Sequence, residues 1–260
     1  MSKKHPYHLV DPSPWPFMGA FSAFIIVIGT ILSARKFNSY VLFAGFGLLA
    51  FTMIGWWRDI IKEAKTEHND VIRHGFKWGI SLFIASELMF FVAFFWAYFN
   101  ASLMPTLEIG SVWPPKNIKT IDPFDLPYLN TLILLLSGST VTWAHYDMLE
   151  GKIKDSLEKL AVTILLGTSF LGVQAYEYIH ADFAFKGGIY PSTFYMATGF
   201  HGFHVLIGVI FLITCWFRGR LGHFTANDHF GFEAAAWYWH FVDVIWLFLF
   251  VSIYWAGSNH

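Results

Sequence analysis

Long apolar segments separated by shorter polar stretches dominate this chain. Seven of them have about 20 residues, the length that a helix needs to cross the roughly 30 Å hydrocarbon core of a bilayer. None shows the alternation of apolar and polar residues that is typical of a membrane β-strand. Because backbone hydrogen bonds must close internally in lipid, we expect an all-α protein of seven transmembrane helices. The predicted spans are residues 16–34, 40–57, 76–100, 128–147, 158–180, 192–217 and 234–257.

Two polar stretches suggest how these spans are grouped. Residues 58–74, RDIIKEAKTEHNDVIRH, are highly charged and are expected to extend the second helix beyond the membrane. We therefore expect an N-terminal part with two helices at 1–60, a linker at 61–75 and a five-helix group at 76–260. Residues 101–127 contain five prolines, which restrict the backbone, so this stretch is predicted to form an ordered cap.

The composition supports a membrane protein. Of the 260 residues, 13% are charged and 55% are hydrophobic, whereas soluble domains have about 25% charged residues. The net charge of −1 gives no basic face for a nucleic acid. The single cysteine, Cys215, excludes an internal disulfide and is expected to be a buried apolar residue. The N-terminal MSKKHPYHLVDPSPWPF does not have the pattern of a signal peptide.

The positive charges predict an orientation. Cytoplasmic or matrix loops carry an excess of Lys and Arg, and an odd number of spans places the two ends on opposite sides. With the N-terminus inside, the outer side holds Arg35, Lys36, Lys116, Lys119 and Lys186. The inner side then holds Lys3, Lys4, Arg58, Lys62, Lys65, Arg73, Lys77, Lys152, Lys154, Lys159, Arg218 and Arg220.

Several ionisable residues fall inside predicted spans, where they must face protein, water or a partner. His240 and Asp243 are three residues apart and share one helical face. Glu87 lies near the middle of its span. It is expected to be a protonated acid bonded to a neighbouring helix, a group in a hydrated or lipid-lined cleft, or a proton relay. For Glu177 and Asp243, a histidine of a neighbouring helix is a candidate partner.

Histidines within or at the ends of the spans raise the possibility of haem or copper ligation. We expect buried, hydrogen-bonded histidines instead, because they are scattered in depth and no Met, Cys or paired-His pattern completes a copper site. Carboxylates, amides and tyrosines are available as partners. These histidines are His145, His201, His204 and His240.

Arginines beside tryptophans mark the inner helix ends. Arg58 follows Trp56 and Trp57, and Arg218 follows Trp216. A guanidinium within an aromatic belt suits a phospholipid phosphate, although such charges also simply set topology.

Motifs along the whole chain resemble those of subunit III of haem–copper cytochrome c oxidases. They occur in the family's order and are rich in aromatic residues. The motifs are HLVDPSPWP (8–16), WWRD (56–59), SELMFFVAFFWAYF (86–99), WPP (113–115), LNTLILLLSG (129–138), VTWAH (141–145), ATGFHGFHVLIG (197–208) and GFEAAAWYWHFVDVIWLFLFVSIYW (231–255). Departures at Tyr146, Pro191, Asp228 and Ala256 weaken a role of surface histidines in proton collection.

The resemblance implies a two-helix hairpin and a five-helix bundle separated by a V-shaped lipid cleft. It also implies a cofactor-free subunit of an aa3-type oxidase of the aerobic respiratory chain, without catalytic residues. Haem a, haem a3 and copper would lie in partner subunits, with subunit I contacted directly and subunit II in the same complex. Cytochrome c would dock on the complex rather than on this chain.

In that family, subunit III binds phospholipids, supports proton uptake and protects the catalytic subunit during turnover. The matching lipid-contact positions here are Arg58, His68, Glu87 and Arg218. The buried polar positions are Glu87, Glu177, His204, His240 and Asp243. The location implied is a bacterial or mitochondrial inner membrane.

Alternative classes fit less well. Quinol-oxidase relatives resemble five-helix chains that lack the first hairpin, whereas this chain has spans at 16–34 and 40–57. A retinal photoreceptor needs a lysine in its last helix, and residues 234–257 contain none. A transporter is disfavoured because no inverted repeat or broken pair of helices is visible.

Overall fold

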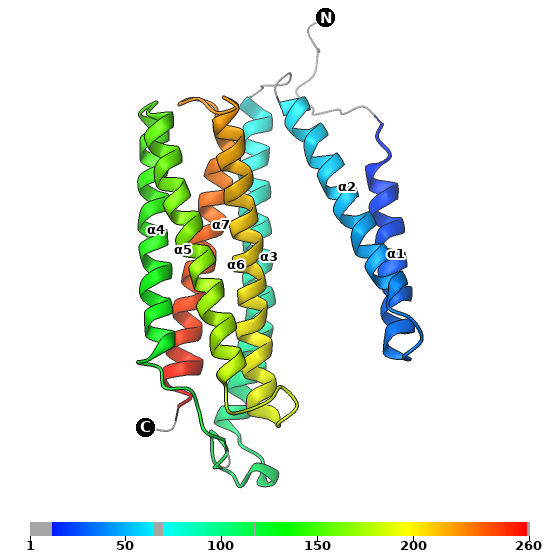
Figure 1. Ribbon diagram of the computed structural model, residues 1–260, viewed down its shortest axis with the longest axis vertical. Helices are drawn as coiled ribbons and strands as arrows, with labels where there is room; N and C mark the ends of the chain where they lie inside the picture. Colours follow the sequence, from blue (N-terminus) through cyan, green and yellow to red (C-terminus); the bar gives the residue numbers. More distant parts are fainter. Residues whose placement is uncertain (1–11, 65–69, 117, 259–260) are drawn as a thin grey trace, which may run out of the picture. The chain divides into compact units, whose positions relative to one another are not determined.

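The computed structural model describes residues 12–64, 70–116 and 118–258. Within these ranges it contains seven long α-helices and no strand, which confirms the all-α prediction (Figure 1). A 3-10 turn, Leu107–Ile109, lies between α3 and α4, and a π-helical segment, Phe250–Trp255, continues α7. The helices are α1 Trp15–Ala34, α2 Tyr40–Ala64, α3 Asp70–Leu103, α4 Leu126–Leu149, α5 Ile153–His180, α6 Ile189–Arg220 and α7 Phe230–Leu249.

The helices extend beyond the predicted spans because their polar ends are also helical. α2 runs to Ala64, which confirms the expected extension into the charged linker. Lysine and glutamate are good helix formers, so the charged sequence after Trp57 does not end the helix. The indole Nε1 of Trp15 donates a 2.6 Å hydrogen bond to Asp59 and ties the start of α1 to this extension.

Six helices in the described part of the chain are long and apolar enough to cross a membrane: α1, α2, α3, α5, α6 and the α7 segment through Trp255. They support a multi-pass membrane protein. α4 has 24 residues and is not among them, because its most apolar stretch is less hydrophobic than theirs. Its polar side chains Asn130, Thr131, Ser137 and Asp147 are buried against other helices. The span predicted at 128–147 is therefore helical, and its passage through the membrane stays a prediction.

The chain divides into two compact units, Met1–Gly79 and Ile80–His260. In the first, α1 and α2 form an antiparallel hairpin with close backbone contact (Figure 1). A Cβ atom at Gly29 would collide with the backbone of Leu42, and one at Gly45 would lie 3.0 Å from the Ile26 nitrogen. By contrast, nothing lies within 4 Å of the position of a Cβ atom at Gly47.

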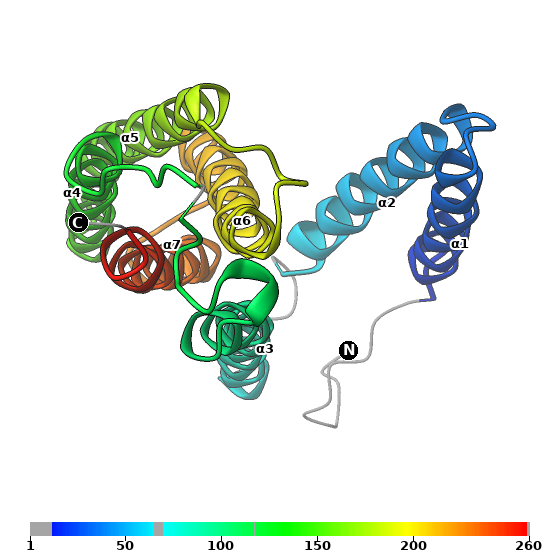
Figure 2. The same cartoon turned by 90° about the horizontal axis from the view of Figure 1, so that it is seen from below.

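α7 is the central helix of the second unit. It packs against α4 and α6, and Figure 2 shows these helices end-on beside it. The buried ring of Trp239 lies against Gly167 of α5 and Gly208 of α6. Its indole Nε1 donates a 2.9 Å hydrogen bond to Ser137 of α4. One side chain of α7 therefore joins three neighbouring helices. Cys215 is buried, as expected.

The second unit's part of α3 joins the bundle through aromatic side chains. Phe95 meets Phe248 with ring centroids 4.5 Å apart in a T-shaped arrangement, and Phe90 meets Phe200 at 5.1 Å. Edge-to-face packing of this kind stabilises more than its buried area alone. Large rings therefore fill the space between α3 and its neighbours.

The proline-rich stretch after α3 is folded against the helix ends. The ring of Trp113 packs against those of Tyr98 and Tyr190, with centroids 5.5 and 5.4 Å apart. Lys119 forms a 2.7 Å ion pair with Asp182 in the loop after α5. These contacts agree with the ordered cap expected from its prolines.

Candidate functional site

The first polar group is partly buried and joins α3 to α6. Nε2 of His204 lies 2.8 Å from Oε2 of Glu87, and Nδ1 of His204 lies 2.7 Å from the carbonyl oxygen of Phe200. Because a carbonyl can only accept, Nδ1 must carry a proton. The contact between Nε2 and the carboxyl needs a second proton, which either Nε2 or Oε2 can hold. Glu87 and His204 thus form a pair that shares this second proton.

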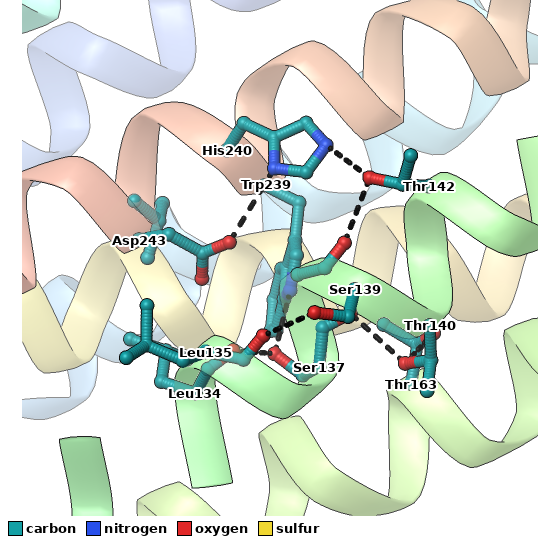
Figure 3. Close-up of polar contacts among 12 residues, drawn as sticks. Leu134, Leu135, Ser137, Ser139, Thr140, Thr142, Thr163, Trp239, His240 and Asp243 are labelled. Atoms are coloured by element: carbon teal, nitrogen blue, oxygen red, sulfur yellow. Dashed lines mark hydrogen bonds and ion pairs between the residues drawn. The ribbon is translucent and has the colours of Figure 1, made fainter. Parts of the chain in front are cut away.

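A second group lies where α4 meets α7 (Figure 3). Nδ1 of His240 is 3.5 Å from Oδ2 of Asp243, and Nε2 of His240 is 3.1 Å from the hydroxyl of Thr142. That hydroxyl is also 2.9 Å from the carbonyl of Gly138. The glycine at position 138 makes room for this carboxyl, because a Cβ atom there would collide with Oδ2 of Asp243.

A third group surrounds Glu177 near the end of α5. Its Oε1 accepts hydrogen bonds from the hydroxyl of Tyr254 at 2.7 Å and from Nε2 of Gln174 at 3.0 Å. Nδ2 of Asn130 donates to Oε1 of Gln174 at 3.5 Å. These four side chains come from α4, α5 and the π-helical segment, and all are buried.

The five predicted buried polar residues, Glu87, Glu177, His204, His240 and Asp243, fall in these three groups. Their partners differ in part from those expected. Glu177 bonds to an amide and a phenol rather than to a histidine, because the π-helical segment presents Tyr254 to it. Asp243 contacts a histidine of its own helix, three residues away, and not one of a neighbouring helix.

Residues proposed for lipid contact lie in both units. Arg58 on α2 has a side chain that is 80% exposed, and its Nε lies 4.0 Å from Asp59. Arg218, in the last turn of α6, is part-buried, and its guanidinium lies 4.7 Å from the ring centroid of Phe224. His68 lies outside the described residues. Fourteen residues of α6 separate Arg218 from His204, about 21 Å along the axis, so Arg218 and Glu87 lie at different depths.

The histidines considered for metal ligation have other contacts. Nε2 of His201 donates to the carbonyl of Val242 at 3.2 Å, and the ring of His145 packs against those of His229 and Phe232. In the described ranges, no three His, Cys, Asp or Glu side chains lie close enough to hold a metal ion.

A family model, cytochrome c oxidase subunit III, matches residues 5–258. The chain belongs to this family. Cytochrome c oxidase subunit 3 of Marchantia polymorpha is 56% identical over 100% of this chain and 99% of its own length. The Arabidopsis thaliana protein is 53% identical over 99% of this chain and 98% of its own length, and that of Scyliorhinus canicula is 52% identical over 98% of each chain. The resemblance inferred from the motifs is thus confirmed.

Membership of the subunit III family implies a complex with other oxidase subunits in a respiratory membrane. In that setting, the three polar groups can bind protons and join helices. The family motifs contain Glu87, His204, His240 and Asp243, but they do not indicate how these residues pair.

Sequence reasoning missed several members of these groups. Thr142 and Gly138 are parts of the motifs VTWAH and LNTLILLLSG, but small and hydroxyl residues on an apolar helix give no distinct signal. Tyr254 reaches Glu177 from a π-helical turn that helical periodicity does not predict. The ion pair of Lys159 with Asp147 was also missed; Lys159 lies 4.3 Å above the ring of Trp143.

Proposed function

We propose that this chain is a cofactor-free integral subunit of an aa3-type cytochrome c oxidase. It packs on the catalytic subunit I, with subunit II in the same complex, and the haems and copper lie in those partners. It supports proton uptake by the catalytic subunit and protects it from inactivation during turnover. The observation that carries this proposal is the subunit III match over nearly the whole chain.

The proposed architecture is a two-helix hairpin and a five-helix bundle separated by a V-shaped cleft that holds phospholipid. Support comes from the α1–α2 hairpin, whose two helices pack closely on each other. Support for five helices in the second group comes from the contacts of Glu87, Phe90 and Phe95 with α6 and α7. The proposed boundaries remain 1–60, 61–75 and 76–260.

Arg218 is a suitable group for a lipid phosphate. Its guanidinium stacks on Phe224, and its Nε has no hydrogen-bond partner among the described residues. A buried, unpaired guanidinium N–H favours an anionic ligand, and arginine matches phosphate geometry. Arg58, His68 and Glu87 complete the proposed lipid-contact set.

The proposed location is a bacterial or mitochondrial inner membrane, with the N-terminus on the cytoplasmic or matrix side and the C-terminus on the opposite side. The excess of Lys and Arg at the inner helix ends supports this orientation.

Lipid analysis of the purified oxidase tests the proposal. The double variant Arg58→Ala/Arg218→Ala should retain less phospholipid per complex than the wild type. Arg220→Ala is the matched control, because Arg220 lies in the same last turn of α6 but is exposed, with its guanidinium over the ring of Trp216. Equal lipid content in all three complexes would contradict the lipid role. Failure of the chain to co-purify with the haem-bearing subunits would contradict membership of the complex.

A further inference from the structure

Hydrogen-bond geometry fixes the tautomer of His240. The hydroxyl of Thr142 donates its single hydrogen to the carbonyl of Gly138 at 2.9 Å. It can therefore only accept in its 3.1 Å contact with Nε2 of His240. Nε2 must then carry the hydrogen that completes this contact.

The other ring nitrogen then needs a donor. A neutral ring with its hydrogen on Nε2 presents a lone pair at Nδ1, which faces Oδ2 of Asp243 at 3.5 Å. An ionised carboxylate also presents lone pairs, so the two groups would face each other without a hydrogen. One further proton, placed between Nδ1 and Oδ2, replaces the repulsion between these lone pairs with a hydrogen bond.

The surroundings enclose the carboxyl and leave the ring open. The side chain of Asp243 is 10% exposed and that of His240 is 45% exposed. Oδ1 of Asp243 is buried and has no partner among the described residues. On the other side, the carboxyl fits against Gly138, where any side chain would displace it. His240 is therefore the more exposed member of this group, and Asp243 is the enclosed one.

We propose that Thr142, His240 and Asp243 form a proton-binding site in which the carboxyl of Asp243 holds one proton and donates a hydrogen bond to Nδ1 of His240. Binding forms an O–H bond at Oδ2, and the hydrogen bond is accepted by Nδ1. Release leaves a carboxylate and a neutral imidazole, and no electron is transferred. The neutral pair is favoured over a carboxylate and an imidazolium because separated charges are costly away from water.

This site is separate from Glu87 and from the arginines of the proposed lipid contact. Its test reads the protonation of one side chain, so it does not depend on lipid content or turnover. The proposed function and this inference therefore fail on different measurements.

Infrared difference spectroscopy of the intact oxidase tests the proposal. Asp243→Asn keeps the size of the side chain and should remove one carboxylic acid C=O band that shifts in D2O. Asp182→Asn is the control, because Asp182 is solvent-accessible and paired with Lys119, so only carboxylate bands should change. If Asp243→Asn leaves the carboxylic acid bands intact and removes carboxylate bands, the proposal is wrong.

A second variant keeps Asp243 and disturbs the tautomer. Thr142→Val removes the acceptor for Nε2 at an exposed position, so it should fold and should shift the Asp243 C=O band. Ser139→Ala is matched to it, because Ser139 is an exposed hydroxyl of the same helix that bonds only to the carbonyl of Leu135 at 3.1 Å. A band unchanged in Thr142→Val, or shifted equally in both variants, would overturn the proposed role of Thr142 and His240.

Discussion

At the scale of single residues, the buried carboxyl groups Glu177 and Asp243 depend on neighbours that a sequence pattern hardly marks. Glu177 relies on Tyr254, and Asp243 relies on the absence of a side chain at Gly138. The presence of carboxylates at membrane depth could be predicted from the sequence. Their partners could not, because they depend on helix rotation and on local widening of the last helix.

Glu87→Gln should leave the initial rate of electron transfer close to that of the wild type, because the redox groups are proposed to lie in partner subunits. An amide N–H can still donate to Nε2 of His204, so the helix contact should persist, but the shared proton is lost. We expect faster inactivation during sustained turnover, measured as oxygen consumption over time. Glu158→Gln, an exposed change on α5, is the control. Loss of the haem spectrum in Glu87→Gln would argue against a supporting role.

Tyr254→Phe should destabilise the second unit. It removes the donor to Glu177 and the acceptor for Gln174 in a buried group, which costs roughly 1–3 kcal/mol when polar atoms are left unpaired. The quantity to measure is the midpoint temperature, at which half of this chain has dissociated from the oxidase. Tyr176→Phe, at an exposed position of α5, should have little effect. A normal midpoint combined with lost activity would point to a functional rather than a structural tyrosine.

At the scale of helices, the apolar segments predicted the position of each helix along the chain, but most of the helices are longer than the predicted spans. α3 and α6 continue past the predicted apolar segments, to the bounds Asp70–Leu103 and Ile189–Arg220, because the length of a helix is not limited by the thickness of the bilayer. The sequence did not predict the central position of α7. Trp239 can lie between α5 and α6 only because each has a glycine opposite the ring, and such a match between distant segments has no local signal.

Gly167→Ala should weaken helix packing around Trp239. The added methyl group would collide with the buried indole, and overpacking of this kind costs about 1–3 kcal/mol. Gly172→Ala is a matched control on the same helix, since nothing lies within 4 Å of the position of its Cβ atom. Heat resistance of the assembled complex should fall for Gly167→Ala only. An equal loss in both variants would mean that helix flexibility, and not contact with Trp239, is responsible.

At the scale of the whole molecule, the number of membrane passages depends on α4. Contacts along α4 and α5 show that the two helices are antiparallel over most of their length. Asn130 meets Gln174 at 3.5 Å, Thr140 meets Thr163 at 2.8 Å, and the carbonyl of Ala144 meets Ser156 at 2.7 Å. Residue numbers rise along α4 as they fall along α5. Because α5 is long and apolar enough to cross a membrane, a helix that accompanies it end to end should cross as well.

Seven passages place the two ends of the chain on opposite sides of the membrane, whereas six would place them on the same side. We therefore expect a reporter fused after His260 to be active on the side opposite to the N-terminus. A reporter inserted at Gly151, in the turn between α4 and α5, is a second readout: it should be on the N-terminal side if α4 crosses and on the opposite side if α4 does not. Activity of the C-terminal fusion on the N-terminal side would show that α4 does not cross. The polar residues of α4 would then be buried in a helix that stays at one surface.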